Sequence, residues 1–464
     1  MKLAKLTVFL LILFAIILPI HGAGDKATVM PKWCRTLRDR VDTWITNGSI
    51  MGAELMIRIN GKDMLHEIWG WNDKEDGIKL EKNRIFRLRS MTKPFVGTAI
   101  LMLMEQGKLS LNDRAAKYLA CFANAKSKTI TIRDLLYHTS GFTMGYPKGS
   151  IDDYTTLKDA VADAAAHGPK YETGKEYHYA DADSAALGLI IWKLTGVPPE
   201  TFIHDNIFKP LGMNDTYCLL QPNQPDRKRV CSTYIWRDGQ YVKFWDNEDP
   251  PETPFFRCSG GVFGTMKDYA TFLDMWMNGG KYREIRLLRD ETIQNALVPG
   301  PVSPRYGMHW EIYHPASGNA ALPVFGHGGS DGTVAIAVPE KNAMVFYFTQ
   351  SRGTLSTLFL EKILLQSLGY IAKKDIPSLT LTSDTLKRYL GDFKMGREIW
   401  TVKQHPGGIS YSVPRLVPLH FVPVSATEFE HPVLDMAIRF IITDGRSDSL
   451  VFRNGTTEVP AKRP

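Results

Sequence analysis

Apolar residues recur along the chain with two different periods, and the change of period divides the sequence into regions. Residues 33–46 carry an apolar stripe at helical spacing. Residues 54–60 and 66–70 have the composition of strands and are separated by Asn60-Gly61, a pair typical of a tight turn. The first part of the chain therefore predicts a helix followed by a β-hairpin.

The central region follows a helical period, and strands return after it. Predicted helices cover residues 94–108, 157–166, 184–194 and 268–278. Predicted strands cover residues 307–313, 333–338 and 343–348, and an apolar helix follows over residues 355–368. Because residues 111–280 are mostly helical patterns broken by loops, we expect an α/β (α+β) fold in which helices flank a sheet and an all-helical region is inserted.

The last ninety residues have a different character. Residues 373–377 (Lys-Lys-Asp-Ile-Pro) have the composition of a linker. Beyond them, short β-rich runs alternate with turn residues, at 400–403, 409–413, 437–443 and 449–452. The sequence therefore predicts two domains, residues 25–370 and a small all-β domain at residues 378–464.

The first 24 residues have the pattern of a signal peptide. Lys2 and Lys5 precede an almost unbroken apolar stretch over residues 6–20, and Gly22-Ala-Gly24 supplies small residues for cleavage. We expect a secreted or periplasmic protein without stable membrane insertion, and the alternative is an uncleaved, signal-anchored form.

Composition narrows the classes of function. The formal net charge of +7 is spread along the chain, and no basic block is interleaved with aromatic residues, so nucleic-acid binding is not expected. The histidines are scattered and no dinucleotide or phosphate-binding motif is present, so neither a metal nor another cofactor is expected. Five cysteines cannot all pair within the chain, and their spacing leaves the pairing open, including a Cys218–Cys231 bridge.

Ser90 and Lys93 form the first candidate for chemistry. They lie three residues apart where a helix is predicted to begin, so the Lys93 amine can reach the Ser90 hydroxyl. A lysine in a dry pocket can lose its proton near neutral pH and act as the base for a serine nucleophile. The alternative is that Ser90 caps the helix and Lys93 is a solvated surface charge.

Residues 177–183 and 325–332 supply two further candidates. Tyr179 and Asp181 can point into one cleft if their segment is extended, whereas the alternative is a core tyrosine and a helix cap. His327 and the glycines after it can contact a substrate and an oxyanion, or simply form a surface turn. Gly328-Gly-Ser-Asp-Gly332 also matches the nucleophile elbow of α/β-hydrolases, but a predicted strand follows it where that motif needs a helix.

These three segments, in this order and at this spacing, resemble the serine β-lactamase and penicillin-binding protein superfamily, above all its class C and carboxylesterase-like branch. The resemblance implies an antiparallel sheet flanked by helices over residues 25–370, and the region that begins at Leu386 resembles the lipocalin-like β domain of some relatives. Further landmarks are Phe86-Arg-Leu-Arg-Ser-Met-Thr-Lys-Pro94, Leu109-Ser-Leu-Asn-Asp113, Leu135-Leu-Tyr-His-Thr-Ser-Gly141, Pro210-Leu-Gly-Met213 and Ser259-Gly-Gly-Val-Phe-Gly-Thr265.

The resemblance assigns roles to individual residues. It implies that Ser90 is the acylated nucleophile, Lys93 its base partner, and Tyr179 the tyrosine of the family's Tyr-x-Asn motif. The N–H groups of Ser90 and Ser330 would form the oxyanion hole. Substrate contacts would come from Asp181 and from the stretch that replaces the family's Lys-Thr-Gly, which is His327, Gly328 and Gly329.

Two departures from the family pattern bear on the substrate. Asp181 stands where Asn is usual, and His327 stands where many relatives have Lys, which weakens the fixed positive charge for a substrate carboxylate. We therefore expect a serine hydrolase acting through an acyl-enzyme on a small or short-peptide ester or amide. The alternatives are β-lactamase or D-Ala-D-Ala carboxypeptidase activity, and a non-catalytic scaffold with the same fold. The sequence does not give the oligomeric state.

Overall fold

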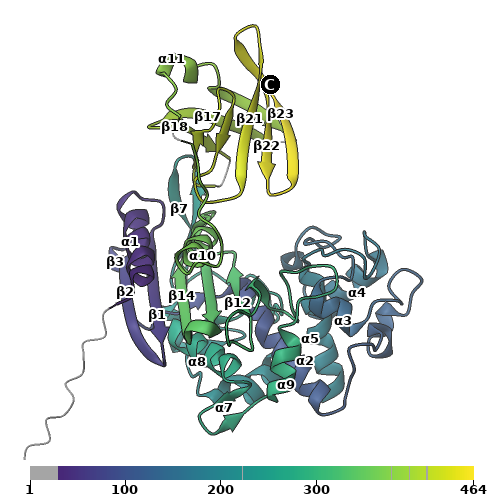
Figure 1. The fold of residues 1–464 in the computed structure, drawn as a ribbon. Coiled ribbons are helices and arrows are strands. Elements are labelled where there is room, and N and C mark those ends of the chain that lie inside the picture. The colour runs from purple at the N-terminus through teal and green to yellow at the C-terminus, as the bar shows by residue number, and fades with distance from the viewer. Residues whose placement is uncertain (1–29, 222, 378, 397, 414–415) are drawn as a thin grey trace, which may run out of the picture.

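The computed structural model describes residues 30–464 except 222, 378, 397 and 414–415. The predicted signal segment, residues 1–24, lies outside these residues. A seven-stranded antiparallel sheet with helices on both faces forms the larger part of the molecule, and a closed β-barrel follows it (Figure 1). Within the described part, no helix is both long and apolar enough to cross a membrane.

The central sheet has the strand order β11-β12-β13-β14-β1-β2-β3. Its strands are β1 (Gly52–Ile59), β2 (Lys62–Asp73), β3 (Ile78–Lys79), β11 (Glu311–His314), β12 (Val324–Gly329), β13 (Thr333–Val338) and β14 (Ala343–Thr349). The first strands pair with the last, for example Met56 with Phe346. Segments almost 300 residues apart in the sequence therefore lie side by side at the centre of the sheet.

Alternate residues of the sheet pack against different helices, as strand geometry requires. Leu55 and Val345 face a core formed with α1 (Lys32–Thr46) and α10 (Ser356–Ser367). Met56 and Phe346 face a core formed with α2 (Lys93–Glu105) and α8 (Met266–Met277). Because both faces are buried, the register of the central strands is fixed.

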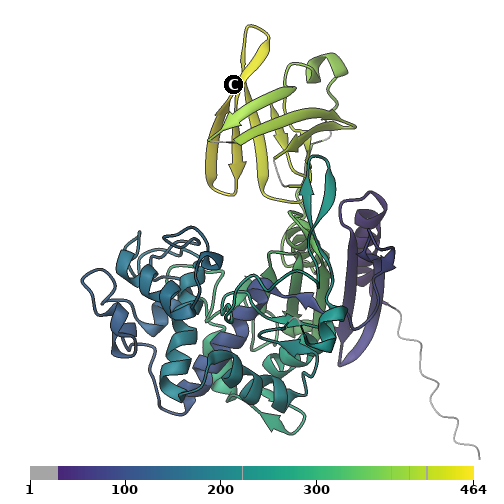
Figure 2. The same cartoon turned by 180° about the vertical axis from the view of Figure 1, so that it is seen from behind.

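The helical region covers one side of the sheet and extends away from it (Figure 2). Its helices are α3 (Ile132–Tyr137), α4 (Leu157–His167), α5 (Asp181–Thr195), α6 (Pro199–Ile203), α7 (Lys209–Leu211) and α9 (Asp290–Ala296). Short helical turns accompany them: η2 (Ala115–Lys117), η3 (Ala120–Phe122), η4 (Ile151–Asp153), η5 (His204–Phe208) and η6 (Pro225–Arg229). A further turn, η7 (Pro339–Lys341), joins β13 to β14. Helix α5 is buried over most of its length and packs against α2, α3 and α4.

Small sheets lie around the central one. Their strands are β4 (Phe86–Arg87), β5 (Thr216–Tyr217), β6 (Thr233–Arg237), β7 (Gln240–Trp245), β8 (Phe263–Gly264), β9 (Lys281–Tyr282), β10 (Ile285–Arg286) and β15 (Ser351–Arg352). The β6–β7 hairpin turns at Asp238-Gly239, both at positive φ, and β6 pairs with β15 after β14. This hairpin adds strands to a stretch whose sequence pattern predicts only helices and loops.

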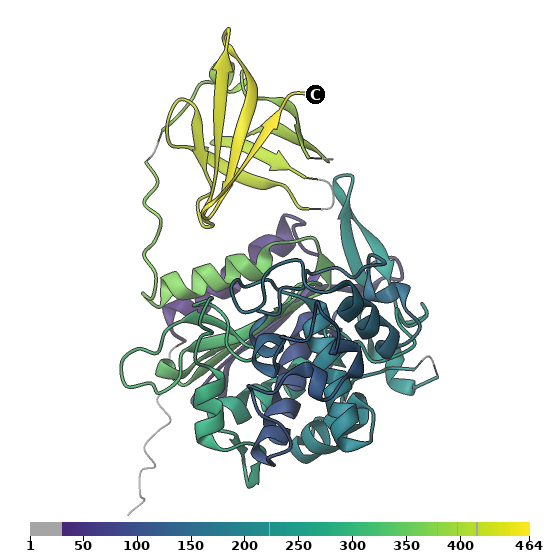
Figure 3. The same cartoon turned by 90° about the vertical axis from the view of Figure 1, so that its right-hand side faces the viewer.

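The C-terminal barrel lies beyond α10, at the end of an extended segment (Figure 3). A short helix α11 (Ser383–Leu386) precedes it. Its strands are β16 (Gly391–Met395), β17 (Glu398–His405), β18 (Gly408–Ser412), β19 (Leu419–Pro423), β20 (Glu428–Glu430), β21 (Met436–Thr443), β22 (Arg446–Asn454) and β23 (Thr457–Lys462), and β23 closes the barrel on β16. The barrel has its own aromatic core, which includes Phe393, Tyr411 and Phe440.

The predicted fold class is confirmed, with three differences in detail. Residues 307–310 were predicted as part of a strand, but β11 begins only at Glu311 because His309 has a left-handed backbone (φ 62°). Helix α5 begins three residues earlier than predicted and includes Asp181. All five cysteines are unpaired, so Cys218 and Cys231 form no bridge.

Candidate active site

Ser90 lies in a short turn at the entrance of α2, not in the α-helix itself. The 3₁₀ turn η1 (Arg89–Thr92) runs directly into α2, which begins at Lys93. Arg89, immediately before Ser90, has a left-handed backbone with φ 50°. A non-glycine residue in this conformation costs about 1–3 kcal/mol and persists only where neighbouring groups hold it. The backbone that presents the Ser90 hydroxyl is therefore strained.

The Lys93 side chain is completely buried and points at the Ser90 hydroxyl. Its Nζ lies 3.3 Å from Ser90 Oγ, 3.0 Å from Asp181 Oδ1 and 2.9 Å from the carbonyl oxygen of Ser259. Burial lowers the pKa of Lys93 below its ordinary value, and the negative charge of Asp181 offsets only part of this effect. The Lys93 amine thus lies within reach of the Ser90 hydroxyl and has a lowered pKa.

Tyr179 lies against the same lysine. The Lys93 Nζ is 4.5 Å from the centre of the Tyr179 ring, and the buried Tyr179 hydroxyl has no hydrogen-bond partner among the described residues. Burial raises the pKa of Tyr179 well above its ordinary value, so the side chain is a neutral phenol that can pass a proton on. Tyr179 precedes α5, whereas Asp181 is the first residue of that helix, so the segment is extended only up to Ala180.

His327 is a buried, neutral imidazole on β12. Its Nδ1 lies 2.8 Å from the Gly328 carbonyl oxygen, and its Nε2 lies 3.2 Å from the Tyr306 hydroxyl. Burial, with help from the charge of Lys93, lowers the pKa of His327 to about 3. His327 therefore supplies no positive charge near neutral pH, unlike a lysine at the same position.

Ser330 opens the tight turn between β12 and β13. The N–H of Gly332 donates to the carbonyl of Gly329 across this turn, and a β-strand follows, so the nucleophile-elbow interpretation of Ser330 is excluded. A Cβ atom at Gly329 would lie 2.3 Å from the carbonyl oxygen of Leu88, two residues before Ser90. A glycine is therefore required here for the hairpin to approach the turn that carries Ser90.

One cavity of about 490 Å³, here called the catalytic cleft, lies at the centre of these residues. Ser90, Asp181, Ser259 and Ser330 line it. Lys93 and His327 are buried behind them, and Lys93 reaches the cleft through Ser90 and Asp181. Tyr179 is half-buried and packs against both Lys93 and His327. The structure thus brings together residues from three distant segments that the sequence singled out.

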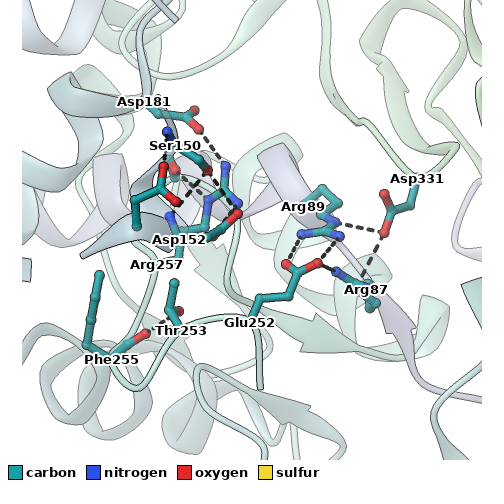
Figure 4. Close-up of polar contacts among 12 residues, drawn as sticks. Arg87, Arg89, Ser150, Asp152, Asp181, Glu252, Thr253, Phe255, Arg257 and Asp331 are labelled. Atoms are coloured by element: carbon teal, nitrogen blue, oxygen red, sulfur yellow. Dashed lines mark hydrogen bonds and ion pairs between the residues drawn. The ribbon is translucent and has the colours of Figure 1, made fainter. Parts of the chain in front are cut away.

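Arg257 is a residue of the cleft that the sequence analysis missed. Its Nη2 lies 2.8 Å from Asp181 Oδ2, and its Nη1 lies 3.4 Å from Asp152 Oδ1 (Figure 4). Asp181 therefore holds Lys93 with one oxygen and Arg257 with the other. Burial alone would raise the pKa of Asp181, but Lys93 and Arg257 outweigh it, so the pKa is lowered and Asp181 is a carboxylate. The only sequence signal for Arg257 is its position two residues before the landmark that begins at Ser259.

An ion network joins the turn of Ser90 to the turn of Ser330, and it too was missed. Arg89 Nε lies 2.7 Å from Asp331 Oδ2, and Arg89 Nη1 lies 2.6 Å from Glu252 Oε2 (Figure 4). Arg87 also contacts Glu252 and Asp331. Arg89 and Asp331 are direct neighbours of Ser90 and Ser330, so the network fixes the two predicted oxyanion-hole residues relative to one another and holds the strained backbone of Arg89.

A second buried polar pair lies behind Tyr179. His138 Nδ1 is 2.7 Å from Asp183 Oδ2, and both side chains are fully buried. The His138 ring lies 4.5 Å from the Tyr179 ring. Burial lowers the pKa of His138 and raises the pKa of Asp183, which favours a neutral pair. His138 belongs to the landmark at residues 135–141, which gives that motif a role in packing Tyr179.

The chemistry available in the cleft is that of a serine, an amine and a phenol. In the part of the chain that the structure describes, no three His, Cys, Asp or Glu side chains are grouped as ligands for a metal ion. The residues at hand can deprotonate a hydroxyl, hold a carbonyl oxygen between two turns and return a proton to a leaving group.

The charges around Lys93 predict opposite pH shifts in two variants. Asp181→Asn removes a charge that raises the pKa of Lys93, so the acidic limb of the kcat/KM profile should move to lower pH. Arg257→Gln removes a charge that lowers this pKa, so the limb should move to higher pH. Profiles of both variants with an ester substrate test this, and shifts in the same direction would contradict Lys93 as the titrating base.

Comparison with known proteins gives one family and a group of related folds. The family model described as Beta-lactamase matches residues 35–367. A protein of Escherichia coli K12, named as a candidate D-alanyl-D-alanine carboxypeptidase, is 27% identical over 352 residues, which cover 66% of this chain and 80% of that protein.

Solved structures share the fold. An octameric penicillin-binding protein homologue from Pyrococcus abyssi has a TM-score of 0.65 and 21% identity, covering 92% of this chain and 99% of that one. Because residues 1–377 make up only about four fifths of the chain, this likeness continues into the barrel. EstCE1, described as a hydrolase with promiscuous acyltransferase activity, has a TM-score of 0.61 and 19% identity, covering 72% of this chain and 97% of EstCE1. A class C β-lactamase has a TM-score of 0.59 and 18% identity, with 73% and 98% covered.

Proposed function

The chain belongs to the Beta-lactamase family, and on that premise we propose that it is a serine hydrolase in which Ser90 forms an acyl-enzyme with an ester or amide substrate. One observation carries the proposal. The amine of Lys93, fully buried and with a lowered pKa, lies 3.3 Å from the Ser90 hydroxyl in a cleft that also contains Ser330. A nucleophile and a base within reach of each other are the minimum requirement for acyl transfer through a covalent intermediate.

Acylation begins with proton transfer from Ser90 to neutral Lys93. The Ser90 oxygen attacks the substrate carbonyl carbon, and the carbonyl oxygen becomes an oxyanion that the N–H groups of Ser90 and Ser330 stabilise. The ion network around Arg89 and Asp331 supports this arrangement because it holds both donor residues in place before substrate arrives.

The leaving group needs a proton when the carbonyl bond to it breaks. Tyr179 is a neutral phenol between Lys93 and His327, so it can donate its proton to the leaving oxygen or nitrogen and recover one from Lys93. Water then attacks the carbonyl carbon of the Ser90 ester while neutral Lys93 accepts its proton. Lys93 returns this proton to Ser90 Oγ as the ester bond breaks and the carboxylic acid is released. Attack by an alcohol or amine in place of water would transfer the acyl group.

The substrate class is an ester or amide rather than a β-lactam. The neutral imidazole of His327 provides no charge for the carboxylate of a β-lactam, and Asp181 already binds Lys93 and Arg257 with its two oxygens. Among the relatives, one is named for carboxypeptidase activity and another for acyl transfer. β-Lactamase or D-Ala-D-Ala carboxypeptidase activity is the second candidate, and a non-catalytic scaffold is the third.

Side-by-side assays distinguish these candidates. We expect hydrolysis of short p-nitrophenyl esters, with little cleavage of nitrocefin. Faster turnover of nitrocefin would make the protein a β-lactamase, and turnover of D-amino-acid amides alone would make it a peptidase. If no substrate is turned over and Ser90 is not covalently labelled, the non-catalytic scaffold is the remaining candidate.

The proposal includes export and a two-domain organisation. The pattern of residues 1–24 supports cleavage of a signal peptide and a secreted or periplasmic location. The hydrolase domain would then cover residues 25–370 and the barrel domain residues 378–464. The partners would be small-molecule or short-peptide substrates, with no nucleic acid involved.

A further inference from the structure

A second cavity of about 380 Å³ adjoins the catalytic cleft and is here called the side chamber. It shares four lining residues with the cleft, namely Arg89, Glu252, Arg257 and Gly260. Neither Lys93, Tyr179 nor His327 borders it. The side chamber therefore begins at the residue before the nucleophile but lies outside the group of proton-transferring side chains.

The walls of the side chamber are mainly apolar. They are formed by side chains from the segments around β5, β7 and β8, which are Leu219, Leu220, Trp245, Phe255, Val262 and Phe263. Its charged residues include Arg89, Glu252 and Arg257 at the border with the cleft, and Arg87 and Arg89 both pair with Glu252. An apolar ligand group with a polar end facing Ser90 matches this distribution.

Hydrogen bonds fix the outer wall. The buried Arg227 donates to the carbonyl oxygens of Leu220, at 2.9 Å, and Asn247, at 2.6 Å. Trp245 Nε1 donates to the carbonyl of Pro250, at 3.4 Å. Because these bonds hold the wall in place, a ligand in the side chamber would not have to order it.

Gly260 lies on the boundary between the two cavities and lines both of them. A Cβ atom built there would lie 3.5 Å from the Arg89 carbonyl carbon and 3.7 Å from Arg257 Nε, which are ordinary van der Waals distances. The backbone of Gly260 is not in the left-handed region. The backbone conformation and the space for a Cβ atom therefore permit a substitution at position 260, on the border that both cavities share.

We propose that the side chamber binds the apolar acyl group of the substrate, an aromatic or medium-chain acyl of about eight carbons. This inference rests on the proposed function of Ser90. The leaving group must lie where Tyr179 and Lys93 can protonate it, and Ser90 and Asp181, through which Lys93 reaches the cavity, line the catalytic cleft and not the side chamber. The acyl group stays attached to Ser90, next to Arg89 at the chamber's entrance. A cavity of about 150 Å³ holds a benzene ring, so the side chamber has room for a larger group.

Chain-length preference tests the inference. We expect kcat/KM for p-nitrophenyl octanoate, measured below its micelle concentration, to exceed that for the acetate at least about tenfold, because each buried CH₂ contributes about 0.8 kcal/mol. Gly260→Leu at the entrance and Leu219→Trp in the wall should each lower this ratio about tenfold. Leu358→Trp, at an exposed position on α10, is the matched control and should leave the ratio unchanged.

The ratio of two rates from one preparation cancels any general loss of activity or of folded protein. Leu219→Trp lies outside the cleft lining, so it keeps the test valid if Gly260→Leu does not fold. The inference would be overturned if the octanoate-to-acetate ratio of kcat/KM is near 1 in the wild type, or if neither variant changes this ratio. Either result would leave the proposed function intact. Failure to hydrolyse either ester, with no labelling of Ser90, would instead remove the proposed function.

Discussion

Replacing Lys93 with methionine should lower kcat/KM for p-nitrophenyl acetate about 10²- to 10⁴-fold, the range supplied by a positioned general base. Methionine has a similar length and no charge, so it suits a site where the lysine side chain is fully buried. The Ser90 hydroxyl would remain in the cleft, but no amine would lie 3.3 Å away to accept its proton. Steady-state kinetics near neutral pH measure the loss.

Lys108→Met provides the matched control, because Lys108 follows the same helix and is exposed. This variant should keep wild-type kinetics within about threefold, as surface substitutions are nearly neutral. Circular dichroism of both proteins should show that they are folded. Near-wild-type activity in a folded Lys93→Met protein would mean that another group deprotonates the nucleophile.

Replacing Asp331 with alanine should lower the free energy of unfolding by about 3–5 kcal/mol, the cost of leaving a buried ion network without one partner. The Asp331 side chain is only 2% exposed and lies 2.7 Å from Arg89 and 3.5 Å from Arg87. Both guanidinium groups are themselves almost completely buried, so Glu252 alone would have to balance them. Equilibrium urea unfolding measures the change.

The same substitution at an exposed ion pair should have little effect. Asp435 is 65% exposed and lies 2.8 Å from Arg453 in the barrel. Asp435→Ala should change the free energy of unfolding by no more than about 1 kcal/mol. An equal decrease in the free energy of unfolding in the two variants would show that the ion network at Arg89 contributes no more to stability than a surface ion pair. In Asp331→Ala we also expect slower ester hydrolysis, because the turns of Ser90 and Ser330 lose their connection.

Much of the fold could be predicted from the sequence because its core elements have clear periodicity. Strand β13 begins and ends as predicted, since Thr333–Val338 is β-branched or small throughout and bounded by Gly332 and Pro339. The β6–β7 hairpin was missed although Asp238-Gly239 is a strong turn signal. Its strands are short, so their alternation is weak. The central strand β6 is also held by β15, more than 100 residues later, and β7 forms the edge of this small sheet.

The candidate site was predictable where several residues share a short motif, and it was not where single residues meet through the fold. Ser90 and Lys93 are one helical turn apart, so their contact follows from local geometry. Arg257 reaches Asp181 across 76 residues of sequence, and Arg89 reaches Asp331 across 242. No periodicity encodes such pairs, and they became visible only when the sheet and the helical region were assembled. The catalytic roles of all these residues remain predictions.

The most direct test is to locate the covalent adduct that a fluorophosphonate probe forms with the protein, by mass spectrometry of its peptides. The probe should modify the peptide that carries Ser90, and the Ser90→Ala variant should remain unmodified. An adduct on Ser330 or another serine, or labelling that persists in Ser90→Ala, would contradict Ser90 as the nucleophile.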